Sequence, residues 1–172
     1  MTTAVTPQPP PATDPHPVPV LASTVLTVVM RVAGPVPTDV HPHALGHPEQ
    51  QVSARIGDVV VYLTDPAVAA RIRQQWDAAQ YLAAARLPER VSQTWLAPQP
   101  GSYPLGIALR LTGPIEVTTR WITGRRTTNT PDHLRVRVDR LVWQVCDQQS
   151  WKRIGHAWFD VQRYLKDGGR PR

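Results

Sequence analysis

The stretch Asp65–Gln80, DPAVAARIRQQWDAAQ, decides the fold because the chain contains a related stretch at Asp147–Gln162, DQQSWKRIGHAWFDVQ. The two copies align at a numbering offset of 82. The matched residues are Asp65 with Asp147, Arg71-Ile72 with Arg153-Ile154, Trp76 with Trp158, and Gln80 with Gln162. Each copy begins with an aspartate at a helix N-cap position and continues with apolar residues spaced three and four apart. The pattern predicts two related amphipathic helices, each with a tryptophan that is most simply a core anchor. The alternative for Trp76 or Trp158 is a ligand-stacking role.

The segments before the two helices are also related. Val25–Val36 and Leu105–Ile115 read as strands that stop at Gly-Pro, and they align at a numbering offset of 79. Val52–Leu63 and Leu134–Val145 alternate apolar and polar residues around a tight turn, which predicts two hairpins. The offset changes from 79 to 82, so three residues are gained between the matched blocks, as expected for a surface loop.

One strand is predicted in the second copy only. Val117–Ile122, VTTRWI, has the composition of a strand. The corresponding segment of the first copy, VPTDVHPHALGHPEQ, contains prolines at positions 37, 42 and 48, which argue against a regular strand there.

These patterns predict an α+β fold with a tandem internal repeat, in which strands are followed by a helix, twice. We expect the two copies to pack as an intramolecular pseudo-twofold dimer with antiparallel sheet, since one copy is too small to cover its own sheet. The expected organisation is a disordered Pro-rich tail (1–22), repeat 1 (23–87), a linker (88–103), a basic ββββα-like repeat 2 (104–167) and a C-terminal tail (168–172).

Composition restricts the function classes. Residues 1–20 lack the basic start and apolar core of a secretion signal, and no apolar run approaches the ~20 residues that span a bilayer. The single cysteine, Cys146, cannot form an internal disulfide, so we expect a cytoplasmic protein without a membrane partner. Residues 98–172 carry thirteen basic and six acidic residues, whereas residues 21–97 balance six with six. This asymmetry favours a polyanionic partner; the alternative is a basic surface that serves solubility.

The order of elements across Leu105–Lys166, and in part across Val25–Ala85, resembles the purine-rich-element-binding (PUR) repeat and, more distantly, the Whirly class of single-strand binders. In the PUR family each repeat has four strands followed by a helix, and two repeats intertwine. The first copy departs from this pattern at its second strand. The resemblance implies single-stranded nucleic acid as the partner and assigns no individual residue.

Arginines on the outward positions of the predicted strands form the first candidate site. The candidate nucleic-acid-binding residues are Arg31, Arg55, Tyr62, Arg110, Arg120, Trp121, Arg125, Arg126, Arg135 and Arg137. We expect Arg31 and Arg55 to lie near Tyr62 in the first copy, and Arg110, Arg135 and Arg137 to lie near Gln144 in the second copy. Guanidinium groups offer forked donors to phosphate, and aromatic rings among them could stack unpaired bases. The alternative is structural: the aligned pairs Arg31/Arg110 and Arg55/Arg137 could bond to carbonyls at the interface between the copies, and arginine is common on solvated sheet faces.

Histidines form the second candidate site. His41, His43 and His47, with Glu49, could ligate Zn²⁺ or another imidazole-preferring metal. An exposed polar loop is the simpler interpretation, because the segment is Pro-rich and the second copy has no counterpart.

Enzymatic chemistry has weaker support. Cys146 with His133 or His156 could suggest a thiol nucleophile, but Cys146 ends an inward-facing strand, where a structural thiol is expected. No glycine-rich phosphate loop is present, and the serines and acids show no triad spacing.

We therefore expect a non-enzymatic module that needs no cofactor and binds nucleic acid, with single-stranded DNA or RNA favoured. One alternative is a protein-interaction or assembly factor, such as an accessory of a phage, plasmid or secretion system, whose partner could add a strand to an exposed sheet edge. The other is a metal-binding protein that uses the His41–Glu49 loop. The sequence leaves the oligomeric state open.

Overall fold

The computed structural model describes residues 27–91, 106–125, 127 and 130–167. The predicted tails at 1–22 and 168–172, most of the predicted linker and Arg126 lie outside these residues. The strands are β1 (Val28–Val32), β2 (Thr38–His43), β3 (Gln51–Ile56), β4 (Val59–Leu63), β5 (Ile107–Leu111), β6 (Val117–Ile122), β7 (His133–Val138) and β8 (Leu141–Val145). The helices are α1 (Pro66–Ala78), α2 (Gln80–Arg86) and α3 (Gln148–Asp167). The α+β class is confirmed.

The strands form two four-stranded sheets, which we call sheet A (order β1-β8-β7-β6) and sheet B (order β2-β3-β4-β5). The first strand of each half therefore lies in the sheet built by the other half. β1 pairs with β8 and β5 pairs with β4, and both pairs are parallel. The prediction of purely antiparallel sheet is wrong for these two pairs, because the exchanged strands enter from a distant part of the chain instead of through a hairpin.

The pairing registers of the two sheets correspond. Val28 lies opposite Leu141 in sheet A, and Ile107 lies opposite Val59 in sheet B; these pairs are related by the offsets of 79 and 82. The same offsets convert the Thr38–Ile56 pair into the Val117–Val138 pair. The three extra residues fall in the loop from β6 to β7, which is longer than the loop from β2 to β3.

The prediction that the first copy lacks its second strand is wrong. β2 pairs along its whole length with β3, and Pro42 lies opposite Val52. β2 is the edge strand of sheet B, so one side of its backbone is not needed for sheet pairing. A proline without an N–H group is tolerated at such a position.

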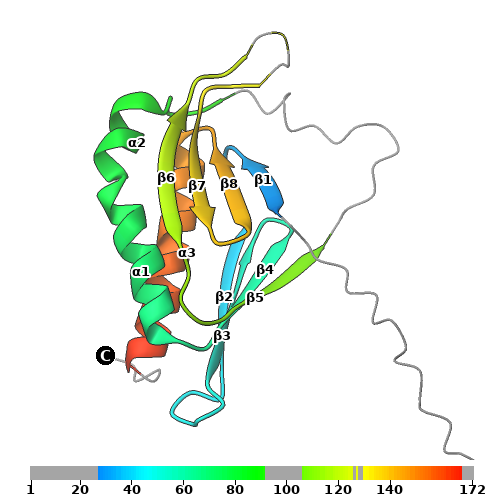
Figure 1. Ribbon diagram of the computed structural model, residues 1–172, viewed down its shortest axis with the longest axis vertical. Helices are drawn as coiled ribbons and strands as arrows, with labels where there is room; N and C mark the ends of the chain where they lie inside the picture. The colour runs from blue at the N-terminus through cyan, green and yellow to red at the C-terminus, as the bar shows by residue number, and fades with distance from the viewer. Residues whose placement is uncertain (1–26, 92–105, 126, 128–129, 168–172) are drawn as a thin grey trace, which may run out of the picture.

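The helices lie together against the inner faces of the sheets. α1 and α3 are side by side, and α2 continues the direction of α1 beyond a break (Figure 1). α3 contacts β2 and β3 of sheet B, whereas α1 contacts β6 of sheet A. The predicted first helix is interrupted at Ala79, whose N–H lies 3.3 Å from the Gln75 carbonyl oxygen and 3.2 Å from that of Trp76.

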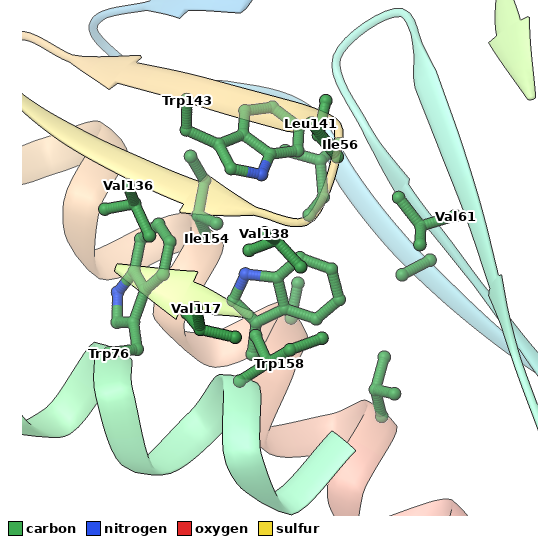
Figure 2. Close-up of a cluster of buried hydrophobic side chains, with 14 of the residues drawn as sticks. Ile56, Val61, Trp76, Val117, Val136, Val138, Leu141, Trp143, Ile154 and Trp158 are labelled. Carbon is green, nitrogen blue, oxygen red and sulfur yellow. The ribbon is translucent and has the colours of Figure 1, made fainter. Parts of the chain in front are cut away.

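Side chains from both sheets and both long helices share one core. Figure 2 shows Trp143 of β8 and Trp158 of α3 near valines of β6 and β7, with Trp76 of α1 beside them. Trp76 and Trp158 are 2% and 1% exposed, which confirms them as core anchors. Both halves contribute to the core, so neither sheet is independently covered.

Candidate nucleic-acid interface

The outer face of sheet A carries four arginines, which we call the arginine face: Arg31 (β1), Arg120 (β6), Arg135 and Arg137 (β7). Strand alternation produces this placement. Leu134, Val136 and Val138 point inward and are fully buried, so Arg135 and Arg137 between them point outward and are exposed. Arg31 and Arg120 occupy outward positions on β1 and β6, the two edge strands of sheet A, by the pairing register.

Three of these arginines lie in a single row across the sheet. Arg120 is opposite Arg135, Arg135 is opposite Gln144, and Gln144 is opposite Arg31. Neighbouring strands are separated by about 4.8 Å, so the row extends over roughly 14 Å across the four strands. The row brings Arg31, from the first half of the chain, next to side chains of the second half.

Hydrogen bonds orient two of the arginine-face side chains. The Nε of Arg31 donates to Oε1 of Gln144 at 3.0 Å. The Nε of Arg137 donates to the carbonyl oxygen of Asp139 at 2.7 Å, in the turn between β7 and β8. Arg55 makes the corresponding bond to the Gly57 carbonyl oxygen at 3.2 Å in the β3–β4 turn. The aligned pair Arg55/Arg137 therefore makes equivalent hydrogen bonds at the two hairpin turns, and not at an interface between the halves.

The strand positions of the arginine face carry positive charges and no negative charge. The remaining outward strand positions are Val29, Thr118, Ile122, His133, Val142 and Gln144, so no strand position on this face carries a carboxylate. Within the described part of the chain, none of the four arginines forms an ion pair. Unneutralised guanidinium groups in one row provide forked donors for the oxygens of a polyanion.

The structure separates the other predicted residues from this face. Arg110 lies on the outer face of sheet B opposite Tyr62 and donates to Oε1 of Gln51 at 3.2 Å. Arg55 lies on the same face, opposite Asp39. The expectation that Arg31 lies near Tyr62 and Arg110 near Gln144 is wrong, because β1 and β5 are exchanged between the sheets.

Trp121 does not belong to the arginine face. It lies opposite Leu134 and packs against the core, on the side of the sheet away from Arg120. The guanidinium carbon of Arg86 lies 5.6 Å from the centre of its ring. Adjacent strand residues point to opposite faces, so Arg120 and Trp121 cannot share one surface. The arginine face therefore has no Phe, Tyr or Trp ring for base stacking among the described residues.

The β6–β7 loop extends beyond the end of sheet A. Arg125 and Thr130 form an antiparallel bridge, with backbone hydrogen bonds of 3.0 and 3.1 Å, and the side chain of Arg125 is exposed. The N–H of Gly124 donates to Oδ1 of Asp132 at 2.6 Å. Arg125 is thus held on an extension of the hairpin that carries Arg120 and Arg135.

The candidate metal ligands are not brought together. His41 and His43 point outward from β2, but Nε2 of His41 contacts Oδ2 of Asp39 at 2.7 Å, and Nε2 of His43 lies 3.1 Å from Oγ of Ser53. His47 lies beyond the end of the strand. Within the described residues, no group of three histidine, cysteine, aspartate or glutamate side chains could hold a metal ion.

Cys146 and His133 are both buried. Burial raises the pKa of the Cys146 thiol to about 11, against a smaller opposing effect of Arg31, so the thiol is protonated at neutral pH. Nδ1 of His133 donates a hydrogen bond of 2.9 Å to the Pro131 carbonyl oxygen, because a carbonyl can only accept. Burial lowers the pKa of His133, and the nearby Arg135 and Arg31 lower it further. His156 is exposed on α3, in a different layer.

Gln144 was expected beside the arginines of the second copy but was not included among the candidate binding residues. It stands in the middle of the arginine row and contacts Arg31. The signal in the sequence was its outward position in the hairpin strand, but its neighbour on β1 depends on the strand exchange.

A search against protein-family models, curated proteins and solved structures found no match. None of the helices in the described part of the chain has the length and hydropathy needed to cross a membrane.

Proposed function

We propose that the chain is a non-enzymatic nucleic-acid-binding module whose arginine face contacts the phosphates of a single strand of DNA or RNA. The observation that carries this proposal is the row Arg120–Arg135–Gln144–Arg31, with Arg137 beside it on β7 and no carboxylate at the strand positions of the face. Phosphate contacts are the dominant source of affinity in sequence-tolerant binding to nucleic acid. The charge of residues 98–172 favours the same partner, because the excess of basic residues lies in the half that forms most of sheet A.

The dimensions of the sheet favour a single strand. The major groove of duplex DNA is about 12 Å wide and accepts a helix or a two-stranded ribbon. Four strands extend over roughly 14 Å before side chains are counted, so sheet A is too broad to enter that groove. Four-stranded sheet faces are used to bind single-stranded RNA. The resemblance to PUR repeats supports the same choice of partner.

The absence of a Phe, Tyr or Trp ring on the described arginine face defines the kind of binding. Without stacked bases, affinity should come from phosphate contacts and depend weakly on sequence. Tyr62 and Arg110 share the outer face of sheet B and could contribute a second, weaker contact, since the Tyr62 ring offers one stacking surface.

We also propose that the chain is an internal duplication packed about a pseudo-twofold axis. The support is that two offsets, 79 and 82, relate both the strand pairings and the positions of Trp76 and Trp158. The exchange of β1 and β5 between the sheets is what intertwined repeats of the PUR type would produce. We place the module in the cytoplasm, because the chain has one cysteine, which is buried and cannot form an internal disulfide.

The test is fluorescence anisotropy with a labelled oligonucleotide at several salt concentrations. We expect binding that weakens with salt, and that weakens further when arginine-face residues are replaced by glutamate. Absence of salt-sensitive binding would reject the proposal.

A further inference from the structure

A cavity of about 430 Å³ lies between the helices, bordered by α1 and α2 on one side and α3 on the other. It opens to solvent, since several of its lining residues, including Asp77, Lys152 and His156, are exposed. The helices cover the inner faces of the sheets, so the cavity is separate from the arginine face (Figure 1). We call it the helix pocket. Local sequence patterns do not predict it, because its walls come from helices in different halves of the chain.

The helix pocket is closed at both ends by contacts between its walls. At one end, Nε2 of Gln148 donates to the carbonyl oxygen of Leu87 at 3.0 Å and to that of Ala84 at 3.4 Å. At the other end, the guanidinium carbon of Arg73 lies 5.6 Å from the ring centre of Phe159. These contacts favour a compact ligand over an extended chain that would have to pass through both ends.

The floor of the helix pocket is aromatic. The rings of Trp76 and Trp151 are stacked, with centroids 4.2 Å apart and planes inclined by 14°. Nε1 of Trp76 donates to the Trp151 carbonyl oxygen at 3.3 Å, which fixes the indole. Gly155 stands over this pair, and a Cβ atom there would lie 3.0 Å from Nε1 of Trp76. The absence of a side chain at Gly155 lets α3 pack closely against Trp76, which is 2% exposed, so only edges of the indole pair line the pocket. The apolar side chain of the lining that is well exposed is Phe159, and an aromatic ring of this kind suits a flat apolar group.

The rim of the helix pocket is positive. Lys152 and His156 are one helical turn apart on α3, and neither forms an ion pair within the described part of the chain. The acid on the opposite wall, Asp77, is already paired with Arg73, with 2.7 Å between Oδ1 and Nη2. The rim therefore offers an ammonium group and an imidazole to an anion, and its one carboxylate is neutralised.

We propose that the helix pocket binds a compact amphipathic anion, with an aromatic or other flat apolar body and a single carboxylate or sulfonate group. The body lies against Phe159 and the edge of the Trp76–Trp151 floor, and the anionic group lies between Lys152 and His156. The volume is within the 300–1,000 Å³ typical of small-molecule sites. This site does not depend on nucleic-acid binding, because it shares no residue with the arginine face.

The probe for the test is 8-anilinonaphthalene-1-sulfonate, titrated into the full chain while energy transfer from tryptophan is recorded. We expect one saturable site, and we expect N-phenyl-1-naphthylamine, which lacks the sulfonate, to bind more weakly. Lys152→Glu should weaken sulfonate binding roughly 3- to 10-fold, whereas Arg153→Glu, the same charge change on an exposed neighbour outside the pocket, should not. Ala84→Trp, which fills the pocket from an exposed position, should abolish saturable binding of both probes.

Circular dichroism of each variant verifies that it is folded. Absence of saturable binding to the wild-type chain would overturn the proposal. Equal weakening of sulfonate binding by Lys152→Glu and Arg153→Glu would also overturn the proposal. Saturable sulfonate binding in Ala84→Trp would overturn it as well. Arg120→Glu/Arg135→Glu should leave probe binding unchanged; loss of probe binding in that variant would move the probe to the arginine face and reject the helix pocket as its site.

Discussion

Oδ2 of Asp147 accepts a hydrogen bond of 2.6 Å from the backbone N–H of Gly34, 113 residues earlier in the chain. The same carboxylate caps α3, because Oδ1 accepts from the N–H and the Oγ–H of Ser150 at 2.8 and 2.7 Å. Asp147 therefore joins the segment after β1 to the start of α3, and it is fully buried. Its counterpart Asp65 caps α1 through one bond, to the N–H of Ala67 at 2.7 Å.

Replacement of these two caps should have unequal effects. Asp147→Ala leaves several buried donors without an acceptor and should lower the free energy of unfolding by about 3 kcal/mol. Asp65→Ala removes one partly exposed cap and should lower it by about 1 kcal/mol. Chemical denaturation followed by circular dichroism measures both. Equal losses would show that the link from Asp147 to Gly34 does not stabilise the fold.

Cys146 should be unreactive in the folded protein. With the thiol pKa raised to about 11, the thiolate fraction at pH 8 is roughly 100-fold below that of an ordinary cysteine with a pKa near 9. We expect iodoacetamide to alkylate Cys146 at least about 100-fold more slowly in the folded protein than in the protein unfolded in guanidinium chloride. Mass spectrometry follows the reaction. Rapid modification of the native protein would contradict the buried position and would revive the thiol-nucleophile hypothesis.

His133 should make stability depend on pH. Its pKa is lowered in the folded state, so the unfolded chain binds a proton near pH 6.5 that the folded chain does not bind. The free energy of unfolding should therefore fall as the pH is lowered through about 6.5 towards the pKa of the folded state. In His133→Leu this component of the pH dependence should be absent, whereas His156→Gln, at an exposed histidine, should retain it. If the free energy of unfolding of His133→Leu depends on pH as that of the wild-type chain does, His133 is not the source of this dependence.

Local patterns in the sequence predicted the elements that depend on neighbouring residues. Alternation in Leu134–Val138 predicted a buried and an arginine-bearing face, and both appear in β7. Spacings of three and four predicted the buried tryptophans of the helices. Alternation also carries the information that Arg120 and Trp121 face opposite ways, so their joint assignment to one site was an avoidable error.

The features that were missed depend on long-range pairing. β1 pairs with β8, although they are the first and the last strand along the chain. Local periodicity in the sequence does not indicate this pairing. The pairing of β1 with β8 places Arg31 on the arginine face, and the pairing of β5 with β4 places Arg110 on sheet B. The strand at Pro42 was missed because its tolerance of proline depends on its position at a sheet edge. The helix pocket depends on the packing of α1 against α3, so the sequence pattern could not predict it either.

The most direct test of the central proposal compares two double variants with matched charge changes. Arg120→Glu/Arg135→Glu reverses two neighbours in the arginine row, whereas Arg71→Glu/Arg153→Glu reverses two exposed, aligned arginines on the helices. Both variants change the net charge equally, so the comparison separates the contribution of the face from that of the total charge. Circular dichroism verifies that each is folded.

The measurement is the anisotropy of a labelled single strand of about 20 nucleotides, titrated with each protein over a range of salt concentrations. The proposal predicts that the wild-type chain binds with a slope of log Kobs against log salt of about −2 to −3, as expected for three or four phosphate contacts. It predicts that the arginine-face variant loses at least about 10-fold in affinity and has a shallower slope, while the helix variant changes much less. No salt-sensitive binding at micromolar wild-type protein, or equal losses in the two variants, would contradict it and would favour a protein partner instead.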